Sequence, residues 1–148
     1  MASAVAAVDV GTKWLVERRL DEPVALVAGL RLDLGYNSGI AFGALTGLPP
    51  WLLMIGVGGM VIGLVVASWR RRLSLPWASV GLLLGGALGN LVDRIDDGRV
   101  TDFIDPPRWP AFNLADTAIT GAVLVLLWRA SKDERRRAAT SGSRIGES

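Results

Sequence analysis

Three long stretches with almost no charge constrain the fold more than any other feature of the sequence. Trp51–Trp69 has nineteen residues and Leu73–Val92 has twenty, all uncharged, and Pro110–Trp128 has nineteen residues with one charge. At about 1.5 Å per helical residue, each stretch is long enough to cross the roughly 30 Å hydrocarbon core of a bilayer. The chain is 51% hydrophobic, and such a composition in so short a chain favours a membrane protein. Tryptophans at or near the ends of these stretches match the aromatic belt of membrane helices; they are Trp51, Trp69, Trp77 and Trp128.

A further span is predicted at the N-terminus, over residues 1–16. It is short, because sixteen helical residues cover only about 24 Å, and it contains Asp9 and Lys13. It has neither the basic start nor the apolar centre of a secretory signal peptide. We therefore expect the natural start of the protein to lie upstream of Met1. The sequence predicts a membrane α-helical fold with four transmembrane helices, at about residues 1–16, 51–69, 73–92 and 110–128.

Charge placement predicts how these helices are oriented. Basic residues gather in the link Arg70–Arg72 and in the tail after Trp128, whereas Asp93–Trp109 holds five aspartates against three arginines. By the positive-inside rule, the basic link and both termini face the cytoplasm, and Glu17–Pro50 and Asp93–Trp109 face outside. We expect a single membrane-embedded domain over residues 1–130 and a charged, disordered cytoplasmic tail over residues 131–148.

The outer segment between the first two spans is too apolar for a plain loop. Val24–Ala28 and Leu30–Leu34 have the composition and alternation of short strands. Asn37-Ser-Gly has the composition of a turn. We expect a small β-sheet on the outer face of the membrane, between helices 1 and 2.

Ionisable and amide side chains inside membrane spans are costly, so each needs an explanation. They occur at helical spacing of three or four residues, which places them on one face of each helix. Lipid would not solvate such faces, so we expect them to face one another or water near the outer end of the bundle. The segment after the third span brings Asp102 to the same level. The polar positions are Asp9, Thr12 and Lys13; Asn90, Asp93 and Arg94; and Asn113, Asp116, Thr117 and Thr120.

The chain has no cysteine and no histidine. This excludes thiol nucleophiles, Ser-His catalysis and His-ligated metal sites. Two carboxylates held close together cannot both ionise cheaply, so one keeps a proton and acts as an acid while the other acts as a base on water. Asp102 and Asp116 are candidates for such a pair, although only the fold can bring them together. We expect no metal or cofactor.

Five blocks of the sequence form a recognisable set, in the order Asp9-Val-Gly-Thr-Lys13, Asn37-Ser-Gly-Ile-Ala-Phe42, Gly85-Gly-Ala-Leu-Gly-Asn-Leu-Val-Asp-Arg94, Gly98-Arg-Val-Thr-Asp-Phe103 and Pro110-Ala-Phe-Asn-Leu-Ala-Asp116. With these blocks the chain resembles the lipoprotein signal peptidase (signal peptidase II) family along nearly its whole length. One departure is Val10, where the family usually has Gln after the first Asp.

The resemblance implies an aspartic endopeptidase of the bacterial cytoplasmic membrane with Asp102 and Asp116 as its catalytic pair. Its substrate would be a prolipoprotein that carries diacylglycerol on a cysteine, cut just before that cysteine, and globomycin would inhibit it. The expected partners are this substrate and membrane lipid, with no nucleic acid, and we expect a monomer. The resemblance also implies residues that support the site or bind substrate: Asp9, Lys13, Asn37, Gly39, Asn90, Asp93, Arg94 and Asn113.

Simpler interpretations of single residues remain open from the sequence. Asp102 could be an ordinary loop carboxylate, and Asp116 could cap the fourth helix, although Asn113 is the better cap. Asp93 and Arg94 could form a charge-paired helix end, and Asp9 and Lys13 a simple i, i+4 ion pair. Asn37 could belong only to a turn.

Other functions also remain open. A small transporter or proton relay would use buried carboxylates, but it should spread them through the depth of the membrane rather than at one face. A catalytically inactive scaffold would not need the aspartate pair. A Ser-Lys peptidase would need a soluble catalytic domain, and no segment here is long enough to form one.

Overall fold

The computed structural model describes residues 1–38, 59, 62–63, 66 and 76–145. The predicted second span and Gly39 therefore lie almost wholly outside the described residues. The described helices are α1 (Ala2–Arg19), α3 (Trp77–Asp96) and α4 (Leu114–Ile145), and the strands are β1 (Val24–Ala25), β2 (Arg31–Asn37) and β3 (Val100–Asp105).

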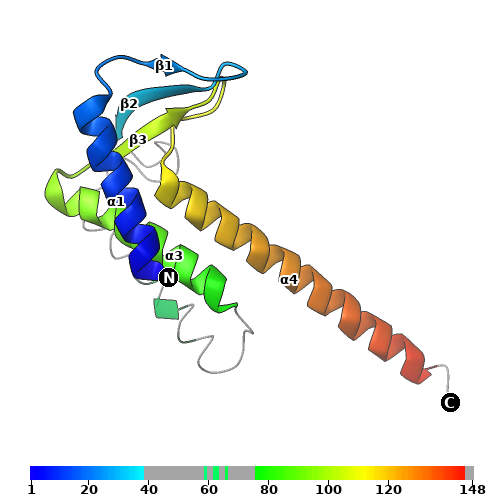
Figure 1. Cartoon of the computed structure of the whole chain (residues 1–148). Coiled ribbons are helices and arrows are strands. Elements are labelled where there is room, and N and C mark those ends of the chain that lie inside the picture. The colour runs from blue at the N-terminus through cyan, green and yellow to red at the C-terminus, as the bar shows by residue number, and fades with distance from the viewer. Residues whose placement is uncertain (39–58, 60–61, 64–65, 67–75, 146–148) are drawn as a thin grey trace.

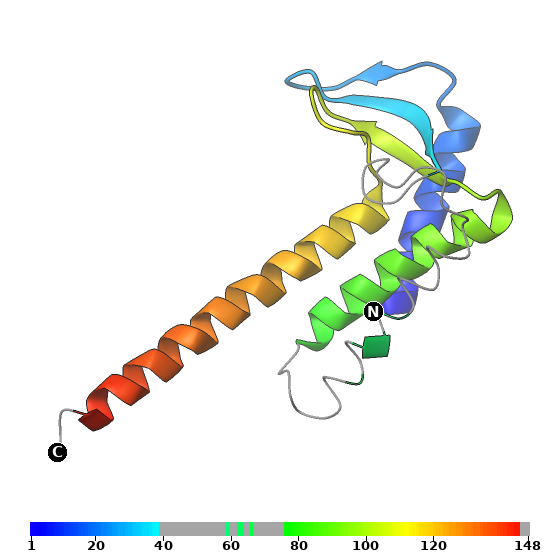
Figure 2. The same ribbon diagram turned by 180° about the vertical axis from the view of Figure 1, so that it is seen from behind.

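The three helices meet beneath one small sheet. Helix α3 packs against both α1 and α4, and α4 begins under the sheet and then diverges from the other two helices (Figure 1). The view from behind shows the same divergence (Figure 2). The beginning of α4, the end of α3 and strand β3 therefore lie close together. Most of the buried polar side chains are concentrated there.

Glycines on α3 allow the helices to approach closely. A Cβ atom at Gly85 would lie 2.7 Å from the carbonyl oxygen of Ala2 on α1, and one at Gly86 would lie 2.6 Å from that of Ala115 on α4. Small residues at helix contacts are the usual way for membrane helices to pack. Helix α3 is thus the central helix of the described bundle.

The sheet is antiparallel, in the order β1-β2-β3. Its first two strands confirm the strands expected in the outer segment, with β1 shorter than predicted and β2 extended to Asn37. Asn37 is therefore the last residue of a strand, paired with Val100, rather than only a turn residue. The third strand was not predicted. It comes from the segment between α3 and α4, and it places Asp102 in the sheet opposite Gly35.

Four membrane spans are not confirmed. Among the described residues, one helix, Trp77–Asp96, is long and apolar enough to cross a membrane, and it covers most of the predicted third span. Helices α1 and α4 form where the first and fourth spans were expected, but α1 carries charges along its length. The length and apolar character of α3 support a membrane protein, while the number of crossings stays a prediction.

The tail that was expected to be disordered lies in helix α4 as far as Ile145. Helix α4 continues without interruption from Leu114 to that residue. The segment 130–145 contains four Arg and three Ala, and these residues have high helix propensity. Their polarity suggested a solvated tail, but it does not prevent a solvated helix.

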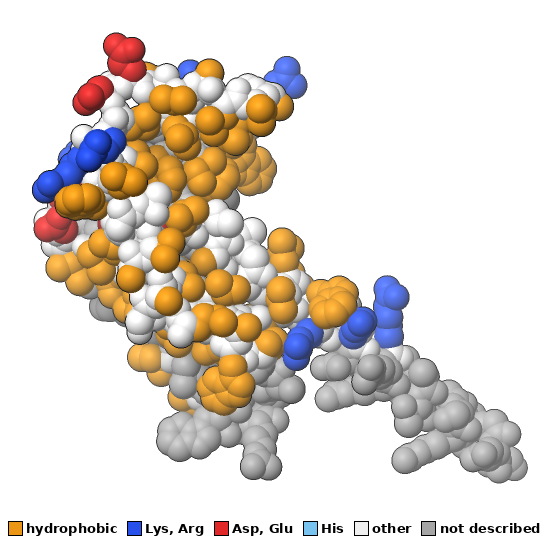
Figure 3. Space-filling model, in the orientation of Figure 1, with side chains coloured by type: hydrophobic (Ala, Val, Ile, Leu, Met, Phe, Trp, Pro, Cys, Tyr) orange, Lys and Arg blue, Asp and Glu red, His pale blue; other side chains and the backbone are white. Residues whose placement is uncertain are grey.

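The distribution of polarity is opposite to that of a water-soluble protein. Buried side chains in the described part are largely polar or charged, whereas many large hydrophobic side chains are exposed, including Ile95, Leu124 and Leu127 at 61–67%. Hydrophobic side chains cover much of the visible face in Figure 3. An apolar surface of this size marks a protein or membrane contact. The buried polar residues are Asp9, Lys13, Ser79, Asn90, Thr101, Asp102 and Asn113.

The close contact at Gly86 predicts a stability effect. Gly86→Ala should destabilise the protein by about 1–3 kcal/mol, because the new methyl group meets a backbone carbonyl that cannot move away cheaply. Thermal unfolding of the purified protein in detergent measures this. Gly121→Ala on α4 is the matched control, because a Cβ atom there has no neighbour within 4 Å, and it should leave the melting temperature unchanged or raise it. Equal effects of the two substitutions would contradict the packing role of Gly86.

Candidate active site

The buried ammonium group of Lys13 lies at the centre of the polar cluster. Lys13 is 2% exposed, and its Nζ lies 2.7 Å from Asp9 Oδ2, 2.9 Å from Asp93 Oδ2 and 2.9 Å from Asn90 Oδ1. The contact with Asn90 is a hydrogen bond, and the contacts with the two carboxylates are ion pairs. The Asp9–Lys13 pair is thus more than a simple ion pair within one helix, because the same ammonium group also binds α3.

Asp9 also connects α1 to the beginning of α4. Its Oδ1 accepts a hydrogen bond of 2.8 Å from the backbone N–H of Ala115. The first N–H groups of a helix have no partner within the helix, and they carry its positive dipole end. A fully buried carboxylate from a neighbouring helix therefore caps α4. Gly89 makes room for it, because a Cβ atom there would collide with the Asp9 carboxylate.

Asn113 is the N-cap residue of α4 and also donates a hydrogen bond to Asp102. Its Oδ1 accepts the backbone N–H of Asp116 at 2.9 Å, as the sequence predicted for this cap. Since that oxygen is engaged, the amide nitrogen faces the other way and donates to Asp102 Oδ1 at 2.8 Å. The cap thus leaves the Asp116 side chain free for other contacts and brings Asp102 to the start of α4.

Asn90 makes the equivalent contact with Asp116. Its Oδ1 accepts from Lys13 and, at 3.2 Å, from Asn113, and its Nδ2 donates to Asp116 Oδ1 at 2.9 Å. Asn113 and Asn90 therefore each donate a hydrogen bond to one of the two candidate carboxylates, and the two amides contact each other. The structure brings Asp102 and Asp116 into one hydrogen-bonded cluster, although they lie fourteen residues apart in the sequence.

The carboxyl group of Asp102 has a raised pKa. It is 4% exposed, and burial together with the charge of Asp116 raises its pKa from 3.8 to about 6. Hydrogen bonds with Asn37 and Asn113 and the charge of Lys13 oppose this rise. Burial and a nearby like charge are the two causes expected for a pair of acid–base carboxylates.

The other predicted site residues lie around this pair. Asn37 contacts Asp102 from β2. Asp93 binds Lys13 and also accepts the backbone N–H of Thr101 at 3.0 Å, so it joins two elements rather than only closing a helix end. Arg94 donates to the carbonyl oxygen of Asn90 at 3.1 Å, and its charge acts on Asp93, Asp102 and Asp116.

Sequence reasoning missed Thr101 and Glu17. Thr101 is 4% exposed, and its hydroxyl donates to Glu17 Oε1 at 2.6 Å. One signal was present, since Glu17 continues the spacing of Asp9 and Lys13 by another four residues. Thr12 and Thr117 were expected on the polar faces, but their hydroxyls bond to the backbone of their own helices.

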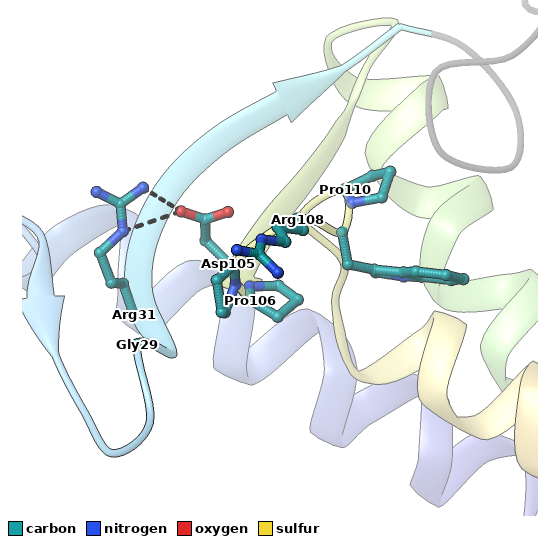
Figure 4. A pocket seen from close by; sticks show the side chains of 8 residues that line it. Gly29, Arg31, Asp105, Pro106, Arg108 and Pro110 are labelled. Carbon is teal, nitrogen blue, oxygen red and sulfur yellow. Dashed lines mark hydrogen bonds and ion pairs between the residues drawn. The ribbon is translucent and has the colours of Figure 1, made fainter.

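A separate hollow lies at the far end of β3 and contains none of these residues. It is open, with a volume of about 530 Å³. Arg31 and Asp105 form an ion pair on its wall, with Arg31 Nε donating to Asp105 Oδ2 at 3.1 Å (Figure 4). Across residues 1–38 and 76–145, no group of three or more carboxylates is arranged to hold a metal ion. The lining of the hollow is Gly29, Arg31, Asp105, Pro106, Pro107, Arg108, Trp109 and Pro110.

Comparisons with known proteins agree on one family. A family model described as signal peptidase (SPase) II matches residues 1–132. The lipoprotein signal peptidase of Mycobacterium avium (strain 104) is 39% identical over 139 residues, which cover 86% of this chain and 74% of the relative. That of Hydrogenovibrio crunogenus is 34% identical over 158 residues, covering 97% and 92%.

Two solved structures described as bacterial membrane enzymes share the fold. Their TM-scores are 0.79 and 0.73, both at 28% identity. The first match covers 90% of this chain and 86% of the solved chain, and the second covers 89% and 90%. Together with the apolar helix α3, they indicate a membrane protein. The family match, the relatives and the shared fold agree, and the chain belongs to the signal peptidase II family.

Proposed function

We propose that this protein removes the signal peptide from bacterial prolipoproteins that carry a diacylglyceryl group on a cysteine, and that it cuts just before that cysteine. Asp102 and Asp116 are its catalytic pair, which makes it an aspartic endopeptidase. The observation that carries the proposal is the paired arrangement of amides, in which Asn113 donates to Asp102 and Asn90 donates to Asp116. The relatives named lipoprotein signal peptidase supply the substrate class.

The positions of the two carboxylates give them different roles. The raised pKa of Asp102, about 6, makes this residue the proposed carrier of the shared proton. Asp116 occupies the first turn of α4, where the helix dipole favours a negative charge. Asp116 therefore acts as the base and Asp102 as the acid.

The reaction then balances with one water molecule. The water oxygen attacks the scissile carbonyl carbon while Asp116 takes a water proton and Asp102 gives its proton to the carbonyl oxygen. The tetrahedral diol collapses as the C–N bond breaks, and the proton on Asp116 moves to the leaving nitrogen. The hydroxyl proton returns to Asp102, so the pair regains its starting state. Arg94 adds positive charge beside both carboxylates.

The proposal includes a membrane setting, which the apolar surface and the distribution of charges support. The protein is a monomer in the bacterial cytoplasmic membrane, with both termini in the cytoplasm and the active site near the outer face. Exposed apolar side chains of α1 and α4 contact lipid and the acyl chains of the substrate. Globomycin inhibits the cleavage.

Removal of either catalytic carboxylate should abolish cleavage. Asp102→Asn and Asp116→Asn keep the size of the side chain but remove the acid or the base, so each should lower the rate by at least about 100-fold. The assay uses purified protein in detergent or lipid with a diacylglyceryl-modified prolipoprotein, with and without globomycin. Asp96→Asn, an exposed aspartate at the end of α3, is the matched control and should cleave normally. Full turnover by either dyad variant would overturn the assignment.

The raised pKa of Asp102 predicts a dependence of stability on pH. Between its unfolded value of 3.8 and its folded value of about 6, the folded protein binds more protons, so stability falls as the pH rises through this window. Above it, ionised Asp102 costs about 3 kcal/mol. Asp102→Asn should therefore raise the melting temperature at pH 7.5, and the gain should shrink as the pH is lowered toward 4. A gain independent of pH would contradict the raised pKa.

A supporting residue should have a milder effect than the pair. Asp93→Asn keeps an oxygen that accepts from Lys13 or Thr101 but removes one negative charge beside the ammonium group. We expect cleavage to fall by about 3- to 10-fold, in keeping with the loss of one charge-assisted hydrogen bond. Initial rates at saturating substrate measure the loss. Abolition of cleavage as complete as for Asp102→Asn would give Asp93 a direct catalytic role.

A further inference from the structure

Thr101 is held by three helices at once, through three different polar groups. Its backbone N–H donates to Asp93 Oδ2 on α3 at 3.0 Å, and its carbonyl oxygen accepts from Asn113, the cap of α4, at 3.3 Å. Its hydroxyl donates to Glu17 Oε1 on α1 at 2.6 Å. Any residue could make the two backbone contacts, whereas the contact with α1 requires a hydroxyl group.

The residue that accepts from this hydroxyl, Glu17, is an exposed residue near the end of α1. Glu17 lies four residues after Lys13 on α1, so it lies one turn along from the buried ammonium group that fixes the helix. A hydrogen bond from a hydroxyl to a carboxylate is short and strong. Strand β3 is therefore tied, immediately before Asp102, to the turn of α1 that follows Lys13.

We infer that the Thr101–Glu17 hydrogen bond positions Asp102 for the proposed reaction. It holds β3 against α1, so that the Asp102 carboxylate stays within reach of Asn113 and close to Asp116. The inference rests on the proposed function and extends it to two residues that touch neither the substrate nor the reacting atoms. Thr101 and Glu17 are thus positioning residues, and Glu17 acts as a hydrogen-bond acceptor rather than as a charge.

The test uses variants that separate the hydroxyl and the acceptor from other properties. Thr101→Val keeps the shape and strand propensity but removes the hydroxyl, and Thr101→Ser keeps the hydroxyl. Glu17→Ala removes the acceptor, and Glu17→Gln keeps an oxygen that accepts while it removes the charge. Glu22→Ala removes an exposed carboxylate just after α1 and is the matched control.

Thr101→Val and Glu17→Ala should each lower kcat about 10-fold while KM changes less than about 2-fold, because misplacing a catalytic group slows the chemical step. Thr101→Ser and Glu17→Gln should stay within about 3-fold of the natural protein, and Glu22→Ala should match it. The double variant Thr101→Val/Glu17→Ala should be no slower than either single variant, because both remove the same interaction. Thermal unfolding gives the melting temperature of each variant. All assays are run below that temperature, so that each variant is folded.

Hydrogen exchange of the segment 99–105 provides a readout that does not depend on activity. Exchange there should be faster in Thr101→Val and Glu17→Ala than in the natural protein. Unchanged kcat in Thr101→Val, additive losses in the double variant, or a loss in Glu17→Gln as large as in Glu17→Ala would overturn the inference. If the natural protein did not cleave the lipidated substrate, the proposed function would fail, and hydrogen exchange alone would then decide whether the contact holds β3.

Discussion

The rest of the site depends on the burial of one positive charge, the ammonium group of Lys13. A charged group away from water is tolerated only when it is paired and hydrogen-bonded, and here it has two ion-pair partners and one hydrogen-bond acceptor. Two of these partners, Asp93 and Asn90, lie on α3, and the third, Asp9, lies on α1. Asp9 then reaches the first turn of α4 through the backbone of Ala115. One ammonium group and its partners therefore join all three described helices at a single level.

This arrangement also fixes the direction of the amides that contact the catalytic pair. An asparagine side chain has an accepting and a donating end. Lys13 occupies the accepting end of Asn90, so the donating end faces Asp116. The backbone of α4 occupies the accepting end of Asn113, so its donating end faces Asp102. Lys13 thus orients the amide that binds Asp116, and the start of α4 orients the amide that binds Asp102. In the proposed reaction the two amides keep both carboxylates in place without neutralising them.

The sequence predicted those parts of the structure that depend on local spacing. Intervals of three or four residues predicted two polar helix faces, one with Asp9 and Lys13 and the other with Asn90 and Asp93. The capping role of Asn113 follows from its place before an apolar helix. Strand β3 was missed because its partner β2 lies more than sixty residues earlier, as the pairing of Gly35 with Asp102 shows. The contact between Glu17 and Thr101 spans 84 residues. No periodicity within either segment could indicate such a contact, since only the packing of α1 against the sheet creates it.

The different environments of the two aspartates follow from the elements that carry them. Asp116 belongs to the first turn of a helix, where unpaired N–H groups favour a negative charge. Asp102 belongs to a buried strand, where no helix dipole offsets the loss of water, and burial together with the charge of Asp116 raises its pKa to about 6. A fold with both residues on one helix would give them similar environments and no preferred acid. Here one carboxylate lies at a helix terminus, and the other lies on a strand that the three helices hold. This difference gives the proposed pair a defined acid and a defined base.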